Sequence, residues 1–337
     1  MPSWSDILEE INNTLSTKGI PDPNAVRKKY LKKVSELSGN DTISYSTCWS
    51  QGKAGDMPGH AVMITEGDIQ GFMHVLQGLN GKNLDVIVHS PGGSAEATEA
   101  IVNYIRGKYQ TIRVIIPQAA MSAASMLACS ADSLVMGKHS SIGPIDPQII
   151  LPNGSMAPAQ AIIEQFEEAK KECGQDQKNA LAWMPILQQI GPHLLKICDN
   201  HSKLAEELVK TWLKKYMFKD DMEGETKAAK IAKELNTHNQ LKTHARHLPA
   251  SWCRDVGLVV EDLENDQKFQ DAVLSVHHAN TLTFERTGAT KIIENHEGMA
   301  YVTSLEIMRK EDKSAPATPS YPKKPSTGKH KNNKRKR

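Results

Sequence analysis

The stretch from Val86 to Gln148 constrains the fold of this chain more than any other part of the sequence. Two apolar, β-branched runs, Val86–Val88 and Val114–Ile116, lack the polar alternation of half-exposed strands. This pattern predicts strands of a parallel sheet that is covered on both faces. Between them, Ala95–Tyr109 carries apolar residues at the helical period. A strand, a helix and a strand in this order predict a βαβ unit, and therefore an α/β fold with a parallel sheet.

Two loops follow the carboxyl ends of these predicted strands, where the functional loops of parallel sheets lie. The first reads Ser-Pro-Gly-Gly, and Gly92 and Gly93 can turn their amides outward at backbone angles that other residues avoid. The second leads into a helix of small residues, and Ser122 and Ser125 lie near its start, where free N–H groups favour negative charge. Together the loops indicate acyl transfer, with a serine nucleophile and amides that hold an oxyanion. A tight turn and a serine-capped packing helix would explain the same residues without catalysis.

The order and the amino-acid sequences of the motifs resemble those of one superfamily. Ser-Pro-Gly-Gly, followed by Ala-Ala-Ser-Met at a helix start, is similar to the Clp-type protease and signal-peptide-peptidase superfamily, and the longer segments resemble its serine dehydrogenase proteinase branch. These segments are H-S-P-G-G, I-V-N-Y-I-R, A-M-S-A-A-S-M-L-A-C-S, M-G-K-H-S-S-I-G-P-I-D-P-Q, H-A-R-H, D-A-V-L-S-V-H-H and K-I-I-E-N-H, in one order between Asp85 and His296. The resemblance implies a ClpP/crotonase-like spiral of βαβ units and a serine-type endopeptidase, that is, a peptide hydrolase.

The resemblance also implies the residues that act. Clp-type proteases carry the basic histidine in a strand resembling Ser141–Gln148, but here Asp146 stands in that place. The serine dehydrogenase proteinase branch uses the order Ser, Asp, His, which would make Asp146 the carboxylate that orients a later histidine. His244 and His247, in T-H-A-R-H, are the first candidates for that base. Lesser candidates are His89, His139, His277 and His278, and a Ser–Lys dyad with Lys138, Lys170 or Lys171 is a variant of the mechanism.

Two serines remain candidates for the nucleophile. Alignment on A-A-S-M favours Ser125, whose following amide, that of Met126, would join Gly92 and Gly93 in the oxyanion hole. Members of the branch often read M-S-A-G-T, with threonine at the place of Ser125, and this version matches the serine to Ser122. The two serines lie one helical turn apart on one face, so both can line one pocket.

Charge and cysteine usage bear on compartment and partners. The 337-residue chain has a formal charge of +2, but Lys323–Arg337 holds eight basic and no acidic residues, so residues 1–322 carry about −6. We therefore do not expect the body to bind nucleic acid. Five scattered cysteines without a C-x-x-C pair argue against disulfides or a zinc site and for a reducing compartment. With no signal-peptide pattern and no run of about 18 apolar residues, we expect a cytoplasmic protein without membrane contact, metal or cofactor.

The chain divides into three predicted parts. Residues 1–40 show two amphipathic stripes, which predict a helical arm; residues 41–300 form the Clp-like domain; and residues 301–337 are a disordered basic tail. Within the domain, residues 157–218 are helical by period and predict an insert, which the resemblance makes a lid or oligomerisation element and which is otherwise a plain helical subdomain. Phe269–Phe284 is expected to close the folded part.

The resemblance implies a homo-oligomer that acts on a peptide or protein substrate. Because the sequence contains no P-loop, any energy-dependent unfolding would come from another chain. Two other classes fit the same fold. A crotonase-like enzyme holds a thioester enolate with paired amides and needs no serine at the helix start, and a non-catalytic scaffold keeps the fold without the chemistry.

Overall fold

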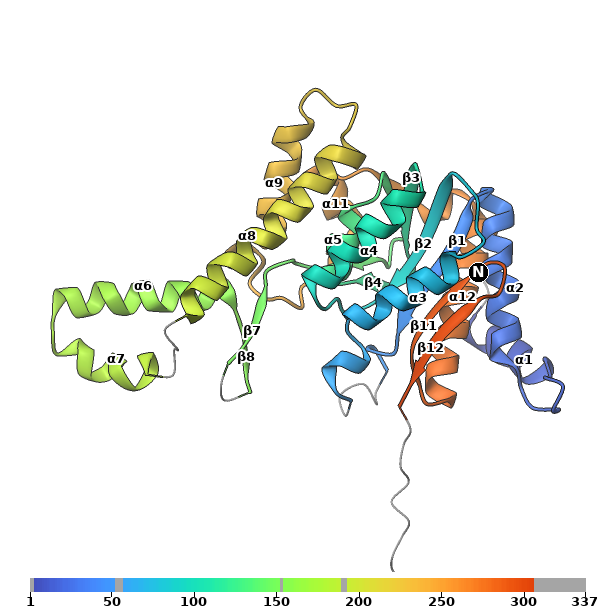
Figure 1. The fold of residues 1–337 in the computed structure, drawn as a ribbon, viewed down its shortest axis with the longest axis horizontal. Coiled ribbons are helices and arrows are strands. Elements are labelled where there is room, and N and C mark those ends of the chain that lie inside the picture. The colour runs from blue at the N-terminus through green and yellow to red at the C-terminus, as the bar shows by residue number, and fades with distance from the viewer. Residues whose placement is uncertain (1–2, 52–56, 152–153, 189–192, 306–337) are drawn as a thin grey trace, which may run out of the picture. The chain divides into compact units, whose positions relative to one another are not determined.

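The computed structural model describes residues 3–51, 57–151, 154–188 and 193–305. A sheet in the order β10-β5-β3-β2-β1-β11-β12 lies at its centre (Figure 1). Strands β10 to β1 run parallel, whereas β11 pairs antiparallel with β1, and β12 with β11. The strands are β1 (Asp41–Thr47), β2 (Asn83–His89), β3 (Thr111–Ile116), β5 (Ser133–Met136), β10 (Val260–Asp262), β11 (Ala289–Asn295) and β12 (Ala300–Ser304). The predicted α/β class is confirmed.

The predicted βαβ unit consists of β2, α4 (Ala95–Lys108) and β3. Ser94 caps α4, because its hydroxyl accepts the Ala97 N–H at 3.0 Å. Along β2, Val86 and Val88 pack on the side of α4, and Ile87 packs on the opposite side. Burial on both faces explains why this strand reads as an unbroken apolar run.

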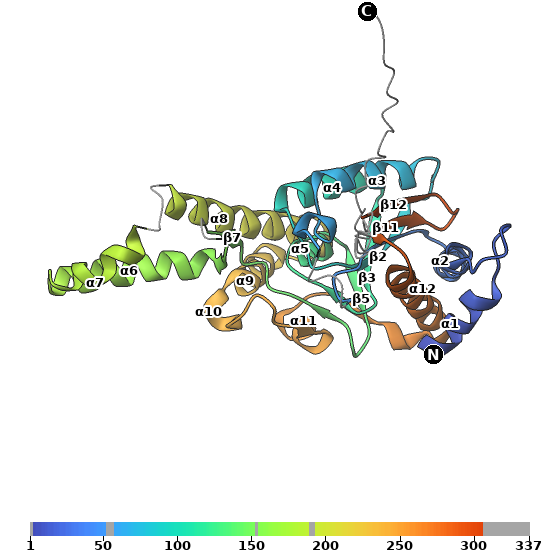
Figure 2. The same ribbon diagram turned by 90° about the horizontal axis from the view of Figure 1, so that it is seen from below.

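Helices cover both faces of the sheet (Figure 2). On one face lie α3 (Glu66–Leu76), α4 and α5 (Ala123–Cys129), and the same core includes α8 (Leu194–Trp212), α9 (Gly224–Asn236) and α11 (Ala250–Val256). On the other face lie α2 (Pro23–Ser38) and α12 (Gln267–Arg286), with α1 (Trp4–Asn13) against α12. The remaining short elements are η2 (Gly59–Ala61), α10 (His238–Leu241) and η4 (Leu263–Asn265). None of the helices in the described ranges combines the length and apolarity that a membrane crossing requires.

A second, three-stranded sheet is small but positions the site. Its strands are β4 (Ala119–Ala120), β6 (Ser141–Ile142) and β9 (Leu248–Pro249), in that order. β4 runs parallel to β6, and β9 runs antiparallel to β6.

The region predicted as a helical insert, residues 157–218, follows a hairpin of β7 (Gln148–Ile150) and β8 (Met156–Pro158), and its first two residues belong to β8. It continues through α6 (Ala159–Gln175), α7 (Asn179–Leu187), α8 and the π-helical turn η3 (Leu213–Met217). No residue of α7 is buried, whereas the second half of α8 joins the main core through Ala205, Val209 and Trp212. The second half of α8 therefore belongs to the hydrophobic core that covers one face of the central sheet.

Two expectations for the C-terminal region are wrong. The folded part continues past Phe284, because β11 and β12 follow α12. Residues 301–304, which the sequence pattern assigned to the tail, lie in β12, where Tyr301 packs against the main core. The rest of the predicted tail, from residue 306, lies outside the described residues.

A buried ion pair joins the N-terminal arm to the sheet. Arg27 of α2 is 1% exposed, and its Nε donates to Glu294 of β11 at 2.9 Å. The other guanidinium nitrogens donate to Thr283 at 2.8 Å and to Asn24 at 2.7 Å. Burial raises the pKa of the Glu294 carboxyl group, although the Arg27 charge opposes that shift.

We expect Arg27→Ala to lower the free energy of unfolding by about 3–5 kcal/mol, because it leaves Glu294 buried without its partner. Lys29→Ala is the control: the Lys29–Glu10 pair is exposed, and its loss should cost less than about 1 kcal/mol. Denaturant unfolding measures both, and adding Glu294→Gln to Arg27→Ala should recover part of the loss. Equal effects of the two single variants would contradict a structural role of the buried pair.

Candidate active site

The Pro-Gly-Gly turn after β2 lies directly against the start of α5. A Cβ atom at Gly92 would lie 2.7 Å from Ser122 Cβ, 2.7 Å from Ala123 N and 2.5 Å from Met121 O. A Cβ atom at Gly93 would lie 2.3 Å from Ile64 O. Both glycines also have positive φ, at 93° and 153°. Only glycine fits these two positions, and it brings the turn into contact with Ser122.

Ser122 has a backbone conformation that L-residues rarely adopt, with φ 53° and ψ −122°. It sits between β4 and α5, half-buried, and its hydroxyl forms no capping hydrogen bond. A serine on a strained turn between a strand and a helix is the arrangement that presents a nucleophilic hydroxyl in α/β-hydrolases. Strain of this kind persists where the surrounding packing enforces it, and all seven residues of α5 are buried.

Backbone amides beside Ser122 are available to an anion. The Gly92 N–H donates to Ser90 Oγ at 3.2 Å. By contrast, the N–H groups of Gly93 and Ala123 donate to no acceptor within the described ranges. The predicted donor at Met126 is wrong, because its N–H donates to the Ser122 carbonyl at 3.0 Å inside α5.

The turns around Ser122 are joined by backbone hydrogen bonds. Ser90 N–H donates to Ala119 O at 3.2 Å, and Met121 N–H donates to Ser90 O at 2.9 Å. On the other side of the glycine turn, Ile64 N–H donates to Gly92 O at 2.7 Å. The serine turn and the glycine turn therefore form one rigid unit.

Ser125 has a different environment from Ser122. Its side chain is fully buried, its hydroxyl donates to Ala120 O at 2.7 Å, and it accepts the Gly143 N–H at 2.9 Å. The hydroxyl thus links α5, β4 and the segment after β6. Both of its hydrogen-bonding roles are used inside the protein.

The three-stranded sheet brings distant parts of the chain to one edge. Ala120, Ile142 and Leu248 lie side by side in one row of β4, β6 and β9. Because β9 is antiparallel to the other two, the start of β9 lies at the edge where β4 and β6 end. Ser122 follows this row by two residues and Asp146 follows it by four, while His244 precedes it by four.

Asp146 and His244 form a hydrogen bond at this edge. His244 Nδ1 lies 2.8 Å from Asp146 Oδ1, and the Asp146 side chain is 3% exposed. An ionised carboxylate only accepts hydrogen bonds, so Nδ1 carries the hydrogen and Nε2 of a neutral ring is left as the acceptor. Among the described residues, Ser122 and His244 are not joined by a hydrogen bond.

A second histidine, which has no counterpart among the sequence-based candidates, also contacts this carboxylate. His238 Nδ1 lies 3.2 Å from Asp146 Oδ2, and Gln148 Nε2 donates to the same oxygen at 2.9 Å. His238 begins α10, and its local sequence carries no motif that marks it. A hydrogen bond from Ile145 N–H to Leu235 O at 2.9 Å joins the Asp146 segment to the end of α9, which precedes His238.

The other basic candidates lie elsewhere. His247 is exposed and pairs with Ser141 Oγ at 2.7 Å through Nδ1. Lys138 is exposed, and so are Lys170, which pairs with Glu167, and Lys171. His89 and His277 pack edge to face, with ring centroids 4.8 Å apart, on the α12 side of the sheet. His277 borders, with His139 and His278, a cavity of about 590 Å³.

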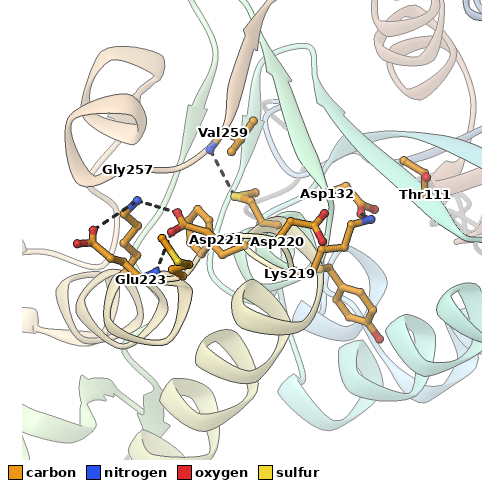
Figure 3. Close-up of a pocket in the computed structure, with 13 residues that line it drawn as sticks. Thr111, Asp132, Lys219, Asp220, Asp221, Glu223, Gly257 and Val259 are labelled. Atoms are coloured by element: carbon orange, nitrogen blue, oxygen red, sulfur yellow. Dashed lines mark hydrogen bonds and ion pairs between the residues drawn. The ribbon is translucent and has the colours of Figure 1, made fainter.

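A pocket of about 870 Å³ lies away from this chemistry, between η3, α9 and the start of β3 (Figure 3). None of Gly92, Ser122, Asp146 and His244 lines it. Two ion pairs border it: Lys227 lies 2.7 Å from Asp221, and Lys219 lies 3.4 Å from Asp132. Across the described part of the chain, no group of three or more His, Cys, Asp or Glu side chains is arranged to hold a metal ion.

Comparison with known proteins agrees with the sequence resemblance. Residues 74–270 match the family model described as ClpP-like SDH-type serine proteinase. Two uncharacterized proteins of Methanocaldococcus jannaschii, MJ1495 and MJ0137, are 33% identical over 177 residues and 27% identical over 180 residues. The matches cover 52% and 53% of this chain and 51% and 54% of those proteins, so the chain spans about half the length of the curated relatives it matches.

Among solved structures, the matches include two mutants of the 1510-N membrane-bound stomatin-specific protease, one of them in complex with a substrate peptide. Their TM-scores are 0.37 and 0.35, at 17% and 20% identity. Each match covers 68% of this chain, and 82% and 78% of the respective solved chains.

We expect Ser125→Ala to lower the free energy of unfolding by about 1–3 kcal/mol, because the Gly143 N–H and the Ala120 carbonyl lose a buried partner. Ser122→Ala should change it by less than about 0.5 kcal/mol, because the Ser122 hydroxyl forms no hydrogen bond with any described residue. Thermal or denaturant unfolding compares the two variants. A larger loss for Ser122→Ala would contradict the structural role of the Ser125 hydroxyl.

Burial lowers the pKa of His89 to about 4 and that of His277 well below its ordinary value. The folded state therefore binds fewer protons than the unfolded state. The contribution of these two histidines to the free energy of unfolding is fully present above about pH 6.5 and is lost as the pH drops toward 4. His89 alone should account for about 3 kcal/mol of that loss. His89→Gln should flatten the pH dependence of the unfolding free energy, and the exposed His201→Gln should not. Equal slopes for His89→Gln and the wild type would contradict the burial argument.

Proposed function

The chain belongs to the ClpP-like SDH-type serine proteinase family, and we propose that it is a serine peptidase in which Ser122, His244 and Asp146 form the catalytic triad. Ser122 is the nucleophile, His244 the general base and acid, and Asp146 the orienting carboxylate. The amides of Gly93 and Ala123 hold the oxyanion.

The observation that carries this proposal is the convergence of three segments at one edge of the small sheet. Ser122, Asp146 and His244 all extend from the row formed by Ala120, Ile142 and Leu248. The Asp146–His244 hydrogen bond of 2.8 Å supports the assignment of carboxylate and base, because it fixes the ring with Nε2 available.

In the proposed reaction, Ser122 Oγ attacks a peptide carbonyl carbon while His244 Nε2 takes the hydroxyl proton. The carbonyl oxygen becomes negative and accepts hydrogen bonds from the Gly93 and Ala123 N–H groups, each worth roughly two to three orders of magnitude in rate. His244 then gives the proton to the leaving amine, and the C–N bond breaks to leave an acyl-enzyme. Water, deprotonated by the same imidazole, hydrolyses the ester and restores the serine.

In the described part of the substrate-free chain, Ser122 and His244 share no hydrogen bond. Catalytic hydrogen bonds are often long before substrate binds and shorten in the complex. His244 lies on a loop between α10 and β9, where Lys242 takes a left-handed backbone conformation with φ 70°. In the proposal, movement of this loop on substrate binding brings the imidazole to the serine.

The substrate in this proposal is a peptide or an unfolded protein segment, and the enzyme acts as a homo-oligomer. Exposed apolar side chains on the hairpin and on α7 support a contact surface there. They are Ile150, Met156, Leu181, Met184 and Ile186.

A fluorophosphonate probe tests the nucleophile, because it reacts with activated serines. We expect mass spectrometry of the labelled full-length chain to find the adduct on Ser122, and Ser122→Ala to abolish labelling. Asp146→Asn should slow labelling by about 10⁴-fold, the loss that follows when the orienting carboxylate of a triad is changed.

Adduct formation on Ser125 would overturn the choice of serine. Absence of labelling on folded wild-type protein would favour a crotonase-like enzyme or a non-catalytic scaffold. If Asp146→Asn slows labelling only a few-fold, Asp146 is a structural residue of its turn and not a member of the triad.

A further inference from the structure

The carboxylate of Asp146 is held by three donors rather than one. It is 2% exposed, and His244 occupies Oδ1 at 2.8 Å. His238 and Gln148 both donate to Oδ2, at 3.2 Å and 2.9 Å. Within the described residues, its side-chain partners are the two imidazoles and the Gln148 amide, and no lysine or arginine is among them.

We propose that His238 is a positioning residue of the catalytic centre, which holds Asp146 Oδ2 so that Oδ1 faces the base His244. This inference rests on the proposed function. It assigns to His238 a role through Asp146, without contact to the substrate.

The geometry of a carboxylate makes such a residue necessary. The carboxylate of aspartate rotates broadly about its last torsion, because that torsion joins an sp³ and an sp² carbon. A donor on Oδ1 alone leaves this rotation open. Two further donors on Oδ2 fix the plane of the carboxylate, and then the direction of the Oδ1 hydrogen bond is fixed as well.

His238 is itself held in place more firmly than the loop that follows it. Its backbone N–H donates to Gln160 Oε1 in the first turn of α6 at 3.1 Å. Its carbonyl accepts the Lys242 N–H at 2.6 Å, which closes α10. The side chain is 18% exposed, compared with 25% for His244. The more anchored imidazole therefore supports the carboxylate, and the less anchored one is free to act on substrate.

The alternative assignment, in which His238 is the base and His244 the support, makes a different prediction. Asparagine carries its amide nitrogen close to the position of histidine Nδ1, so His238→Asn keeps the donor to Asp146 but removes the ring. A base cannot be replaced in this way. His238→Leu removes both the donor and the ring.

The experiment measures the second-order rate constant for fluorophosphonate labelling of Ser122 in the full-length chain. We expect His238→Leu to lower it by roughly 10- to 100-fold, because a hydrogen bond to a charged group is lost. His238→Asn should stay within about three-fold of the wild type. His201→Leu, a change of an exposed histidine on α8, is the matched control and should have no effect.

A second measurement separates positioning from a general loss of structure. The His244 Nδ1–H proton, bonded to Asp146, should give a downfield proton resonance in the wild type and in His238→Asn. In His238→Leu that resonance should broaden or disappear, while circular dichroism stays unchanged.

Equal labelling rates in His238→Leu and the wild type would overturn the inference and leave the proposed triad intact. Equal losses in His238→Asn and His238→Leu would overturn it in favour of His238 as the base. If the wild-type protein is not labelled at Ser122, the proposed function fails first, and the inference falls with it.

Discussion

The candidate site depends on how closely two backbone turns approach each other. The Cα atom of Gly92 occupies a position where any side chain would collide with Ser122 and with the backbone on either side of it. This approach places the amide of Gly93 and that of Ala123 beside one hydroxyl. The conformation of Ser122 is costly, and it is maintained because all seven residues of α5, which follows it, are buried. Close packing of the alanines in α5 therefore maintains the strained backbone conformation that positions the Ser122 hydroxyl.

The same turn is supported by β11, a strand close to the edge of the sheet. Lys291 of β11 is 3% exposed and forms hydrogen bonds with Asp68, at 2.9 Å, and with the carbonyl of Met63. The next residue, Ile64, pairs with the backbone on both sides of Gly93. The buried Lys291–Asp68 ion pair therefore fixes the segment around Ile64, which contacts the glycine turn. A buried pair of this kind favours one arrangement over others more than it adds net stability.

Much of the fold could be predicted from the sequence because its central strands are apolar on both faces, as Val86–Val88 and Val114–Ile116 are. β11 was missed for the opposite reason. Lys291, Glu294 and Asn295 interrupt its apolar pattern, yet all three are buried, because Asp68, Arg27 and Val75 supply their hydrogen bonds. Partners so far away in the chain leave no local signal. For the same reason, the family resemblance indicated Asp146, and T-H-A-R-H gave His244 and His247 as candidates, but neither could mark His238 or show that the Ser125 hydroxyl points to Ala120.

The segments that meet at β4, β6 and β9 are synthesised far apart in time. The glycine turn and Ser122 leave the ribosome first, Asp146 follows, and His244 arrives only after the whole of α6, α8 and α9 has been made. In the proposed arrangement, a growing chain therefore carries Ser122 without an imidazole beside it. Pairing of β9 with β6 completes the centre, so that a nascent polypeptide is shielded from the nucleophile until the three-stranded sheet has formed.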